Sequence, residues 1–280
     1  MARKKTSPAA HRFAIGFVGG GNMGTALIKG LLNAGLYRAS QIAVSEVDAA
    51  KRRAIARRLR VTVTADNGWL VERSAIVLLA VKPQIVDQVL SQCRAAASRR
   101  QLFISILAGV STARLEAGLG PGTRVVRAMP NTPALLGKGM TVVVRGANAS
   151  ARDERVALRL FGAVGRTAAV ADEALMHAVT GLSGSGPAYV YLFAEALFAG
   201  GVAAGLAPKL AETLCLQTIT GAAAMLSETG QSPAALREMV TSPGGTTLAG
   251  LDELDRRGFV DAVANAVVAA TRRGEELGRG

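Results

Sequence analysis

Short apolar runs alternate with helical patterns along the chain as far as residue 172. The run from Ala75 to Val81 contains no polar residue, which is typical of a central parallel strand covered on both faces. Further runs predict strands at 13–18, 41–45, 61–63, 102–106, 124–127, 141–144 and 167–170. Because helical patterns such as 48–58 and 152–161 lie between them, the sequence predicts an α/β fold with a doubly wound parallel sheet.

The strand pattern ends at Glu173, and helical patterns follow one another from there. A short helix to Val179 precedes helices expected at 187–204, 208–227, 233–239, 246–256 and 259–277. Three of them begin with a proline in the first turn, where an N–H would have no intrahelical partner. We therefore expect a basic disordered tail (1–12), a Rossmann-type domain (13–172) and an all-helical domain (173–280).

One helical segment is apolar on every side. Residues 188–207 contain Glu195 as their only charge, and twenty residues are enough to span a bilayer. The central glutamate, the Gly200-Gly201 pair and the amphipathic helices that follow favour instead a helix that is buried on all sides. In a short helical domain, such a helix predicts that a second subunit covers part of it.

A glycine-rich turn follows the first apolar run. Gly19-x-Gly21-x-x-Gly24 comes directly after Phe13–Val18 and leads into a helical pattern, the context of a dinucleotide-binding fingerprint. Glycines at the first two positions let the backbone approach a pyrophosphate, and the third lets the helix pack close to the strand. We interpret the whole turn as cofactor-binding rather than as a plain tight turn, with the residues Gly19, Gly20, Gly21, Asn22, Met23 and Gly24.

The second strand ends in Ser45-Glu46, about 22 residues after Gly24, where such folds place the group that meets the adenosine ribose. A carboxylate there accepts hydrogen bonds from the ribose hydroxyls of NADH and repels the 2′-phosphate of NADPH. Two alternatives stay open because Lys51, Arg52 and Arg53 are close by. One of them could neutralise a phosphate, or Glu46 could pair with them and face water. We expect NADPH or NADH as cofactor, with NADH used at least comparably.

Composition adds a nucleic-acid hypothesis, since the net charge is +13. The basic residues are scattered along helices with acidic neighbours, and aromatic residues make up only 4% of the chain, so we expect solvated helix faces and no nucleic-acid or membrane partner. Cys93 and Cys215 lie far apart without metal-ligand spacing, which favours buried thiols in a reducing cytoplasm and no metal site. The first ten residues lack the apolar core of a secretory signal.

A second glycine-rich stretch, Ser242-Pro243-Gly244-Gly245-Thr246-Thr247, precedes a predicted helix. Backbone N–H groups at a helix N-terminus, together with the Ser242 hydroxyl, can hold a carboxylate. A plain helix cap explains the same residues equally well, because serine and threonine favour such positions.

Six motifs in this order resemble the pyrroline-5-carboxylate reductase family. They are GGGNMG (19–24), AVKPQ (80–84), ILAGV (106–110), RAMPNTPALLGKGMT (127–141), TGLSGSGPAY (180–189) and TSPGGTTLAGLDEL (241–254). The resemblance runs from about Ile15 to Glu276. It implies reduction of 1-pyrroline-5-carboxylate to L-proline with NAD(P)H, the last step of proline biosynthesis. It also implies a Rossmann-type domain, a helical dimerisation domain, and an active site assembled at their junction from two subunits.

The resemblance also implies roles for single residues. Asn67 contacts the adenosine side of the cofactor. In addition to the glycine turn, Ser45 and Glu46, the expected cofactor contacts are Ala80, Val81, Lys82, Pro83, Leu107 and Ala108. The substrate carboxylate is received by the backbone around Gly245 and Thr246, in a loop that includes Ser242 and Gly244. Thr247 bonds the ring nitrogen as the catalytic residue, and Glu173 shapes the substrate pocket.

Simpler interpretations remain for three of these residues. Lys82 could be a solvated lysine at a helix start, Asn67 an ordinary cap, and Glu173 an exposed glutamate of a first helical turn. For the whole chain, a β-hydroxyacid dehydrogenase-like reductase would need a lysine on the first long helix of the helical domain, and 187–204 has none. A non-catalytic nucleotide-binding protein would have no use for the loop at 242–247.

Overall fold

The computed structural model describes residues 12–278. Apart from the exposed Arg12, the tail expected at 1–12 lies outside the described residues. Contacts divide the chain into two compact units. The first unit runs to Gly184 and also includes the chain from Ala270 onward, and the second unit is Ser185–Ala269. The segment from Glu173 to Gly184, which the sequence assigns to the helical domain, thus packs with the first unit.

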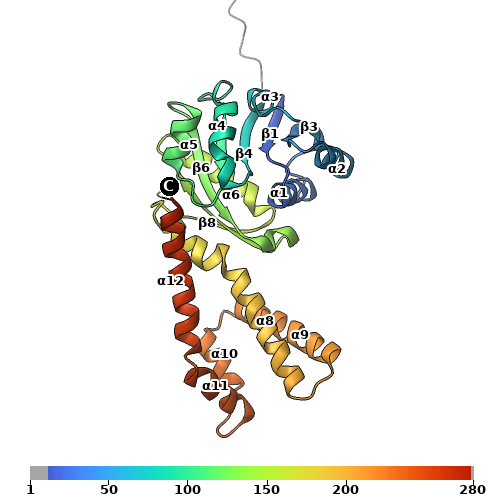
Figure 1. The fold of residues 1–280 in the computed structure, drawn as a ribbon, viewed down its shortest axis with the longest axis vertical. Helices are drawn as coiled ribbons and strands as arrows, with labels where there is room; N and C mark the ends of the chain where they lie inside the picture. The colour runs from blue at the N-terminus through green and yellow to red at the C-terminus, as the bar shows by residue number, and fades with distance from the viewer. Residues whose placement is uncertain (1–11, 279–280) are drawn as a thin grey trace, which may run out of the picture. The chain divides into compact units, whose positions relative to one another are not determined.

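The first unit contains an eight-stranded sheet in the order β3-β2-β1-β4-β5-β6-β7-β8 (Figure 1). The strands are β1 (Phe13–Val18), β2 (Ile42–Ser45), β3 (Thr62–Thr64), β4 (Ser74–Leu79), β5 (Leu102–Ser105), β6 (Arg124–Pro130), β7 (Gly139–Arg145) and β8 (Gly165–Ala169). The strand order reverses direction between β1 and β4, as it does in a doubly wound sheet. The predicted fold class is confirmed.

One pair of strands departs from the predicted parallel sheet. β7 pairs antiparallel with β6, in a register that places Ala128 opposite Val143. The connection between them holds only a 3₁₀ turn, η3 (Thr132–Leu136). A parallel pair needs a crossover of a dozen or more residues, so this short connection returns the chain antiparallel. β8 is parallel to β7 again, after the crossover helix α6 (Ala151–Gly162).

The remaining helices of the first unit connect strands, except α7, which follows the last strand. They are α1 (Asn22–Asn33), α2 (Ala49–Leu59), α3 (Asn67–Glu72), α4 (Val86–Arg94), α5 (Thr112–Leu119) and α7 (Leu175–Val179). The sequence did not predict the short helices α3 and α5, although Asp66 and Ser111 cap them with side-chain hydrogen bonds. Pro83 begins a 3₁₀ turn, η2 (Pro83–Ile85), which precedes α4.

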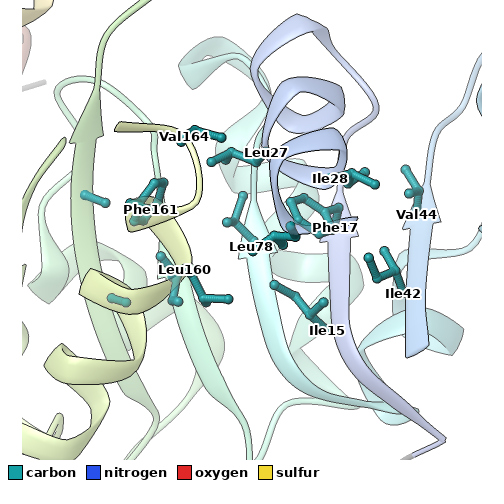
Figure 2. Close-up of a cluster of buried hydrophobic side chains, with 14 of the residues drawn as sticks. Ile15, Phe17, Leu27, Ile28, Ile42, Val44, Leu78, Leu160, Phe161 and Val164 are labelled. Atoms are coloured by element: carbon teal, nitrogen blue, oxygen red, sulfur yellow. The ribbon is translucent and has the colours of Figure 1, made fainter. Parts of the chain in front are cut away.

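Buried side chains cover both faces of the sheet. Along β4, Leu78 belongs to one cluster, whereas Val77 and Leu79 belong to another. This alternation explains the unbroken apolar run, since both faces of a central strand are covered. Figure 2 shows the first cluster, where side chains of α1 and α6 such as Leu27 and Phe161 pack on the sheet.

The second unit is helical. It contains α8 (Gly186–Ala203), α9 (Pro208–Glu228), α10 (Pro233–Met239), α11 (Thr246–Arg256) and the first part of α12 (Phe259–Gly278). Prolines stand in the first turns of α8, α9 and α10, which confirms that prediction. The ring centroids of Phe193 and Phe259 lie 6.2 Å apart, so α8 and α12 touch within this unit.

Within one copy of the chain α8 is not buried on all sides, and the prediction that a second subunit covers part of it stays a prediction. Leu192 is 66% exposed, and among the described residues of this unit only Ala211 and Cys215 are buried apolar residues. The physical reason is that the few helices of one copy leave most of the surface of α8 uncovered. By length and composition alone, the helical stretch Leu175–Ala203 is long and apolar enough to cross a membrane.

Candidate functional site

The glycine turn at the carboxyl end of β1 contains two close backbone approaches, and the sequence predicts the one at Gly24. Gly19 has φ +102°, a conformation that L side chains rarely adopt, and a Cβ on it would lie 2.6 Å from the Ala80 carbonyl oxygen. A Cβ on Gly24 would lie 2.8 Å from the Gly19 carbonyl oxygen. Side chains are therefore excluded at both positions, and α1 starts close against the end of β1.

The N-terminus of α1 is open to a ligand. Its N-cap is Gly21, which makes no side-chain cap hydrogen bond, and a Cβ on Gly21 would meet no atom within 4 Å. The N–H groups of Asn22, Met23 and Gly24 belong to the first turn, where a helix offers them no partner. By contrast, a side chain caps each of α2, α3, α5 and α6. The exposed amides and the positive end of the helix dipole fit a pyrophosphate.

The segments after β4 and β5 lie at the same edge of the sheet as the glycine turn. The Ala80 N–H donates to the Val18 carbonyl (2.8 Å), and the Ile106 N–H donates to the Leu79 carbonyl (3.1 Å). Val81 and Pro83 are half-buried, and Lys82 and Ala108 are exposed. Leu107 is only 2% exposed and belongs to the core, which leaves its backbone as the part a ligand can reach.

Ser45 and Asn67 form a hydrogen-bonded pair beside the glycine turn. The Ser45 hydroxyl lies 2.5 Å from Asn67 Oδ1, and Asn67 Nδ2 donates to Gln92 Oε1 (2.7 Å). Asn67 is the first residue of α3, and its neighbour Asp66 is the cap. The alternative that Asn67 is an ordinary cap is therefore wrong.

Glu46 is linked to the glycine turn itself. Its Oε2 accepts from the Gly20 N–H (3.2 Å), and its Oε1 accepts from the Asp48 N–H (3.0 Å). The Arg52 guanidinium donates to the carbonyls of Glu46 (2.6 Å) and Val47 (2.7 Å). Within residues 12–278, Glu46 forms no ion pair with Lys51, Arg52 or Arg53, and its side chain is half-buried. The alternative in which it pairs with them is not observed.

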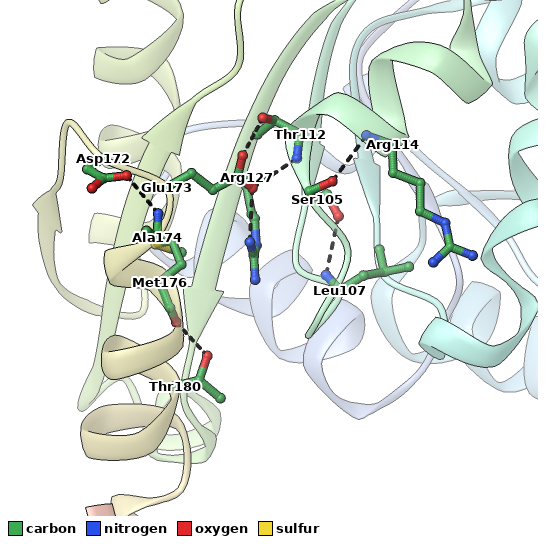
Figure 3. A network of polar contacts seen from close by, with 11 residues as sticks. Ser105, Leu107, Thr112, Arg114, Arg127, Asp172, Glu173, Ala174, Met176 and Thr180 are labelled. Atoms are coloured by element: carbon green, nitrogen blue, oxygen red, sulfur yellow. Dashed lines mark hydrogen bonds and ion pairs between the residues drawn. The ribbon is translucent and has the colours of Figure 1, made fainter. Parts of the chain in front are cut away.

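Glu173 lies in a polar network that sequence reasoning missed (Figure 3). Its carboxylate accepts from the Thr112 N–H (2.9 Å), the Thr112 hydroxyl (2.5 Å) and the Arg127 guanidinium (2.9 Å). The Arg127 side chain is 4% exposed and that of Glu173 is 27% exposed. Glu173 is thus not the exposed helix-start glutamate of the simpler interpretation. A buried arginine on a central strand was the one sequence feature that could have indicated this pair.

The loop before α11 is the counterpart of the glycine turn in the second unit. Gly244 has φ +69°, the Gly245 N–H donates to the Ser242 carbonyl (3.0 Å), and Gly245 is the N-cap of α11 without a side-chain cap hydrogen bond. The plain-cap alternative is therefore not observed, because neither a serine nor a threonine side chain caps this helix. Thr246 is exposed and Thr247 is half-buried.

The part of the chain that the structure describes contains no group of three or more His, Cys, Asp or Glu side chains arranged to hold a metal ion. The donors gathered at both glycine loops are backbone N–H groups and hydroxyls. Such donors suit anions such as phosphate and carboxylate.

Comparisons with known proteins identify the family. A family model described as pyrroline-5-carboxylate reductase dimerisation matches residues 173–277, and one described as NADP oxidoreductase, coenzyme F420-dependent, matches residues 14–109. A pyrroline-5-carboxylate reductase of Methanosarcina acetivorans is 44% identical over 95% of this chain and 98% of its own length. The chain belongs to the pyrroline-5-carboxylate reductase family.

Solved structures of pyrroline-5-carboxylate reductases agree with this assignment. That of Coxiella burnetii is 35% identical with a TM-score of 0.89, over 95% of this chain and 98% of the other. That of Plasmodium falciparum, solved with NADP bound, is 32% identical with a TM-score of 0.85, over 96% and 100%. The chain is an NAD(P)H-dependent oxidoreductase that reduces 1-pyrroline-5-carboxylate to L-proline, and it self-associates.

Proposed function

We propose that the pyrroline-5-carboxylate reductase reaction of this chain uses two glycine-capped helix starts, that of α1 for the cofactor and that of α11 for the substrate. The observation that supports this most is that glycine is the N-cap of both helices, Gly21 and Gly245, with no side-chain cap hydrogen bond. Side chains cap α2, α3, α5, α6 and α10, and the helices α4, α7, α8 and α9, which also lack a side-chain cap, have a residue other than glycine at the N-cap. Open N-termini leave amides for an anionic ligand.

On the cofactor side, the pyrophosphate lies on the amides of the turn Gly19–Gly24. Glu46, with Ser45 and Asn67 behind it, meets the adenosine ribose. The backbone of Ala80–Pro83 and of Leu107–Ala108 borders the rest of the dinucleotide. Glu46 is held by two backbone amides, which supports a fixed carboxylate that selects for ribose hydroxyls over a 2′-phosphate.

On the substrate side, the Ser242 hydroxyl and the amides of Gly244, Gly245 and Thr246 bind the carboxylate of pyrroline-5-carboxylate. Thr247 places its hydroxyl at the ring nitrogen and is the catalytic residue. The nicotinamide supplies the hydride that reduces the C=N bond. The Thr247 hydroxyl can donate a hydrogen bond to the imine nitrogen and relay to it, from solvent, the proton that it gains as the imine becomes an amine.

Two copies of the chain form a homodimer, or a multiple of it, through the exposed apolar surface of the second unit. A groove of about 730 Å³ there is lined almost entirely by apolar groups, including Val190, Leu192 and Phe193 of α8 and Phe259 of α12. The match of residues 173–277 to a dimerisation model supports a second copy, rather than lipid, as the cover of α8. The proposed boundary between the cofactor domain and the dimerisation domain is residue 172.

The cytoplasm is the proposed location, and no nucleic-acid partner is expected. Cys93 and Cys215 are free and buried. Burial raises the pKa of the Cys93 thiol to about 12, which keeps it unreactive and fits a structural thiol in a reducing compartment. Binding to nucleic acid that vanishes at physiological salt would fit the proposal, whereas tight binding at both low and physiological salt would contradict it.

The direct test of the proposed function is oxidation of NADPH and NADH by the purified chain with pyrroline-5-carboxylate. We expect turnover with product identified as proline, and sedimentation as a dimer or a multiple of it at micromolar concentration. Cofactor oxidation only with other imines would contradict the proposed substrate. A stable and active monomer would contradict the proposed dimer.

A further inference from the structure

We propose that Glu173 is a positioning residue that fixes the loop between β5 and α5 on which two expected cofactor contacts lie. This inference rests on the proposed function of that loop. It differs from the role implied by family resemblance, in which Glu173 shapes the substrate pocket. The relevant residues all belong to the first unit.

The Glu173 carboxylate is occupied by protein donors. One oxygen accepts from the Thr112 N–H and from Arg127, and the other accepts from the Thr112 hydroxyl (Figure 3). A carboxylate has about four lone-pair sites, so three of them are used within the chain. Charge-assisted bonds of this kind hold their partners more firmly than neutral ones.

Arg127 explains why the Glu173 carboxylate stays in this place. It lies on β6 in register with Ser105, the last residue of β5, and its side chain is 4% exposed. Within residues 12–278, Glu173 is the only acidic side chain that forms an ion pair with it. A buried guanidinium without a counterion is costly, so Arg127 keeps the carboxylate beside the end of β5.

Thr112 connects the Glu173 carboxylate to the loop. It is the first residue of α5 and ends the segment Ile106–Ser111, which carries Leu107 and Ala108. At the other end of the segment, Ser105 Oγ accepts from the Leu107 N–H (3.3 Å). A carboxylate at the N-terminus of α5 also suits the positive end of that helix. Both ends of the loop are thus attached to the sheet, one through Ser105 and the other through Glu173 and Arg127.

The middle of the loop has one further support. Gly109 has φ +73°, and a Cβ on it would lie 3.5 Å from the backbone carbonyl oxygen of Leu277 in the last turn of α12. The Glu173 bonds are the attachment of this loop that involves a charged side chain, and their removal should change the loop while leaving the surrounding core in place.

Thr112→Val is the sharpest test, because it removes one hydrogen bond and keeps the ion pair between Glu173 and Arg127. We expect the dissociation constant for NADPH or NADH, measured by fluorescence titration of the free enzyme, to rise about tenfold, the effect of one lost charge-assisted bond. Thr112→Ser keeps the hydroxyl and should restore cofactor affinity. Glu173→Gln replaces one carboxylate oxygen, which accepts hydrogen bonds, by an NH₂ group, which can only donate. This variant should weaken cofactor binding further.

Asp172→Asn is the matched control, since Asp172 is an exposed neighbouring carboxylate that, within residues 12–278, accepts only from the Ala174 N–H. It should leave the cofactor dissociation constant unchanged. Melting temperatures of all variants separate folding defects from binding defects. If Thr112→Val and Glu173→Gln lower the melting temperature but leave cofactor affinity unchanged, the network is merely structural and the proposal is overturned.

A rise in KM for pyrroline-5-carboxylate at unchanged cofactor affinity would also overturn the proposal, because it would place Glu173 on the substrate. Failure of the proposed function looks different. In that case the unaltered chain would not reduce pyrroline-5-carboxylate, whereas cofactor titration of Thr112→Val against the unaltered chain would still test the positioning role.

Discussion

The two units of this chain differ in how they bury their apolar residues. The first unit packs large side chains such as Phe17, Phe103 and Phe161 into clusters on both faces of a sheet, and these three are fully buried. The second unit leaves Leu192 66% exposed and Val260 68% exposed. Both units are rich in apolar residues, so composition does not separate them.

The difference lies in how apolar positions are arranged. Helices of the first unit, such as α6, have one buried stripe that faces the sheet, and they complete a core within the chain. The helix α8 is apolar all round, so no single neighbour can cover it. A helix of this kind indicates that the second unit needs another copy of the chain to cover its apolar surface. The first unit should therefore keep its fold and its cofactor affinity when the second unit loses its partner.

The largest effect should follow from a charge placed on α8. Leu192→Glu would bury an unpaired carboxylate in the proposed dimer interface, which costs several kcal/mol. We expect at least a hundredfold weaker dimer and loss of reductase activity at micromolar concentration. Cofactor binding by the first unit should persist, since its core does not depend on the second copy. Sedimentation, the reductase assay and cofactor titration measure the three quantities.

Leu136→Glu is the control for that experiment, because Leu136 is an 85% exposed leucine of the first unit. It should leave the assembly state unchanged. If Leu192→Glu stays dimeric and active, the surface of α8 is not the interface, and the contrast between the two units has another cause.

Thr247→Val should have a smaller effect that is confined to the substrate side. It removes one hydroxyl and keeps the side-chain shape. A hydrogen bond to a charged group is worth about 1.5–3 kcal/mol, so kcat/KM should fall roughly ten- to a hundredfold. Dimerisation and cofactor affinity should not change. Thr241→Val is the matched control, because among the described residues the Thr241 hydroxyl bonds only to the Arg237 carbonyl near the end of α10, to which it donates. Unaltered kinetics of Thr247→Val would remove Thr247 from the catalytic role.

Much of the first unit could be predicted from the sequence because its signals are local. A strand buried on both faces reads as an unbroken apolar run, and Gly19 and Gly24 each have a local steric reason. The short helices α3 and α5 were missed because six and eight residues carry too little periodicity. The antiparallel pair β6–β7 was missed because strand direction depends on the connection between strands and not on the strands themselves.

The polar network around Glu173 could not be predicted, for a different reason. Thr112, Arg127 and Glu173 come from three separate elements, and no spacing between them marks the contact. The same holds for the bond from Gly20 to Glu46, where the sequence indicated both residues but not that one holds the other. For α8 the sequence did indicate a second subunit as cover, but which of its side chains the single copy leaves exposed, such as Leu192, follows only from the fold.

The smallest predicted effect concerns the choice between NADH and NADPH. Glu46→Ser removes the carboxylate that the Gly20 and Asp48 amides hold in place, and with it the repulsion of a 2′-phosphate. We expect the ratio of kcat/KM values to shift toward NADPH by roughly tenfold, the effect of ~1.4 kcal/mol.

Glu46→Gln is the matched variant, because it keeps the shape and one acceptor but loses the charge. A shift in Glu46→Gln as large as in Glu46→Ser would assign the selectivity to charge, and a shift in Glu46→Ser alone would assign it to the support of the glycine turn. In the Leu192→Glu background, the ratio of the two cofactor dissociation constants should shift equally, since Glu46 and the glycine turn belong to the unit that completes its own core. A strong preference of the unaltered chain for NADPH that Glu46→Ser leaves unmoved would show that Glu46 is not the selector.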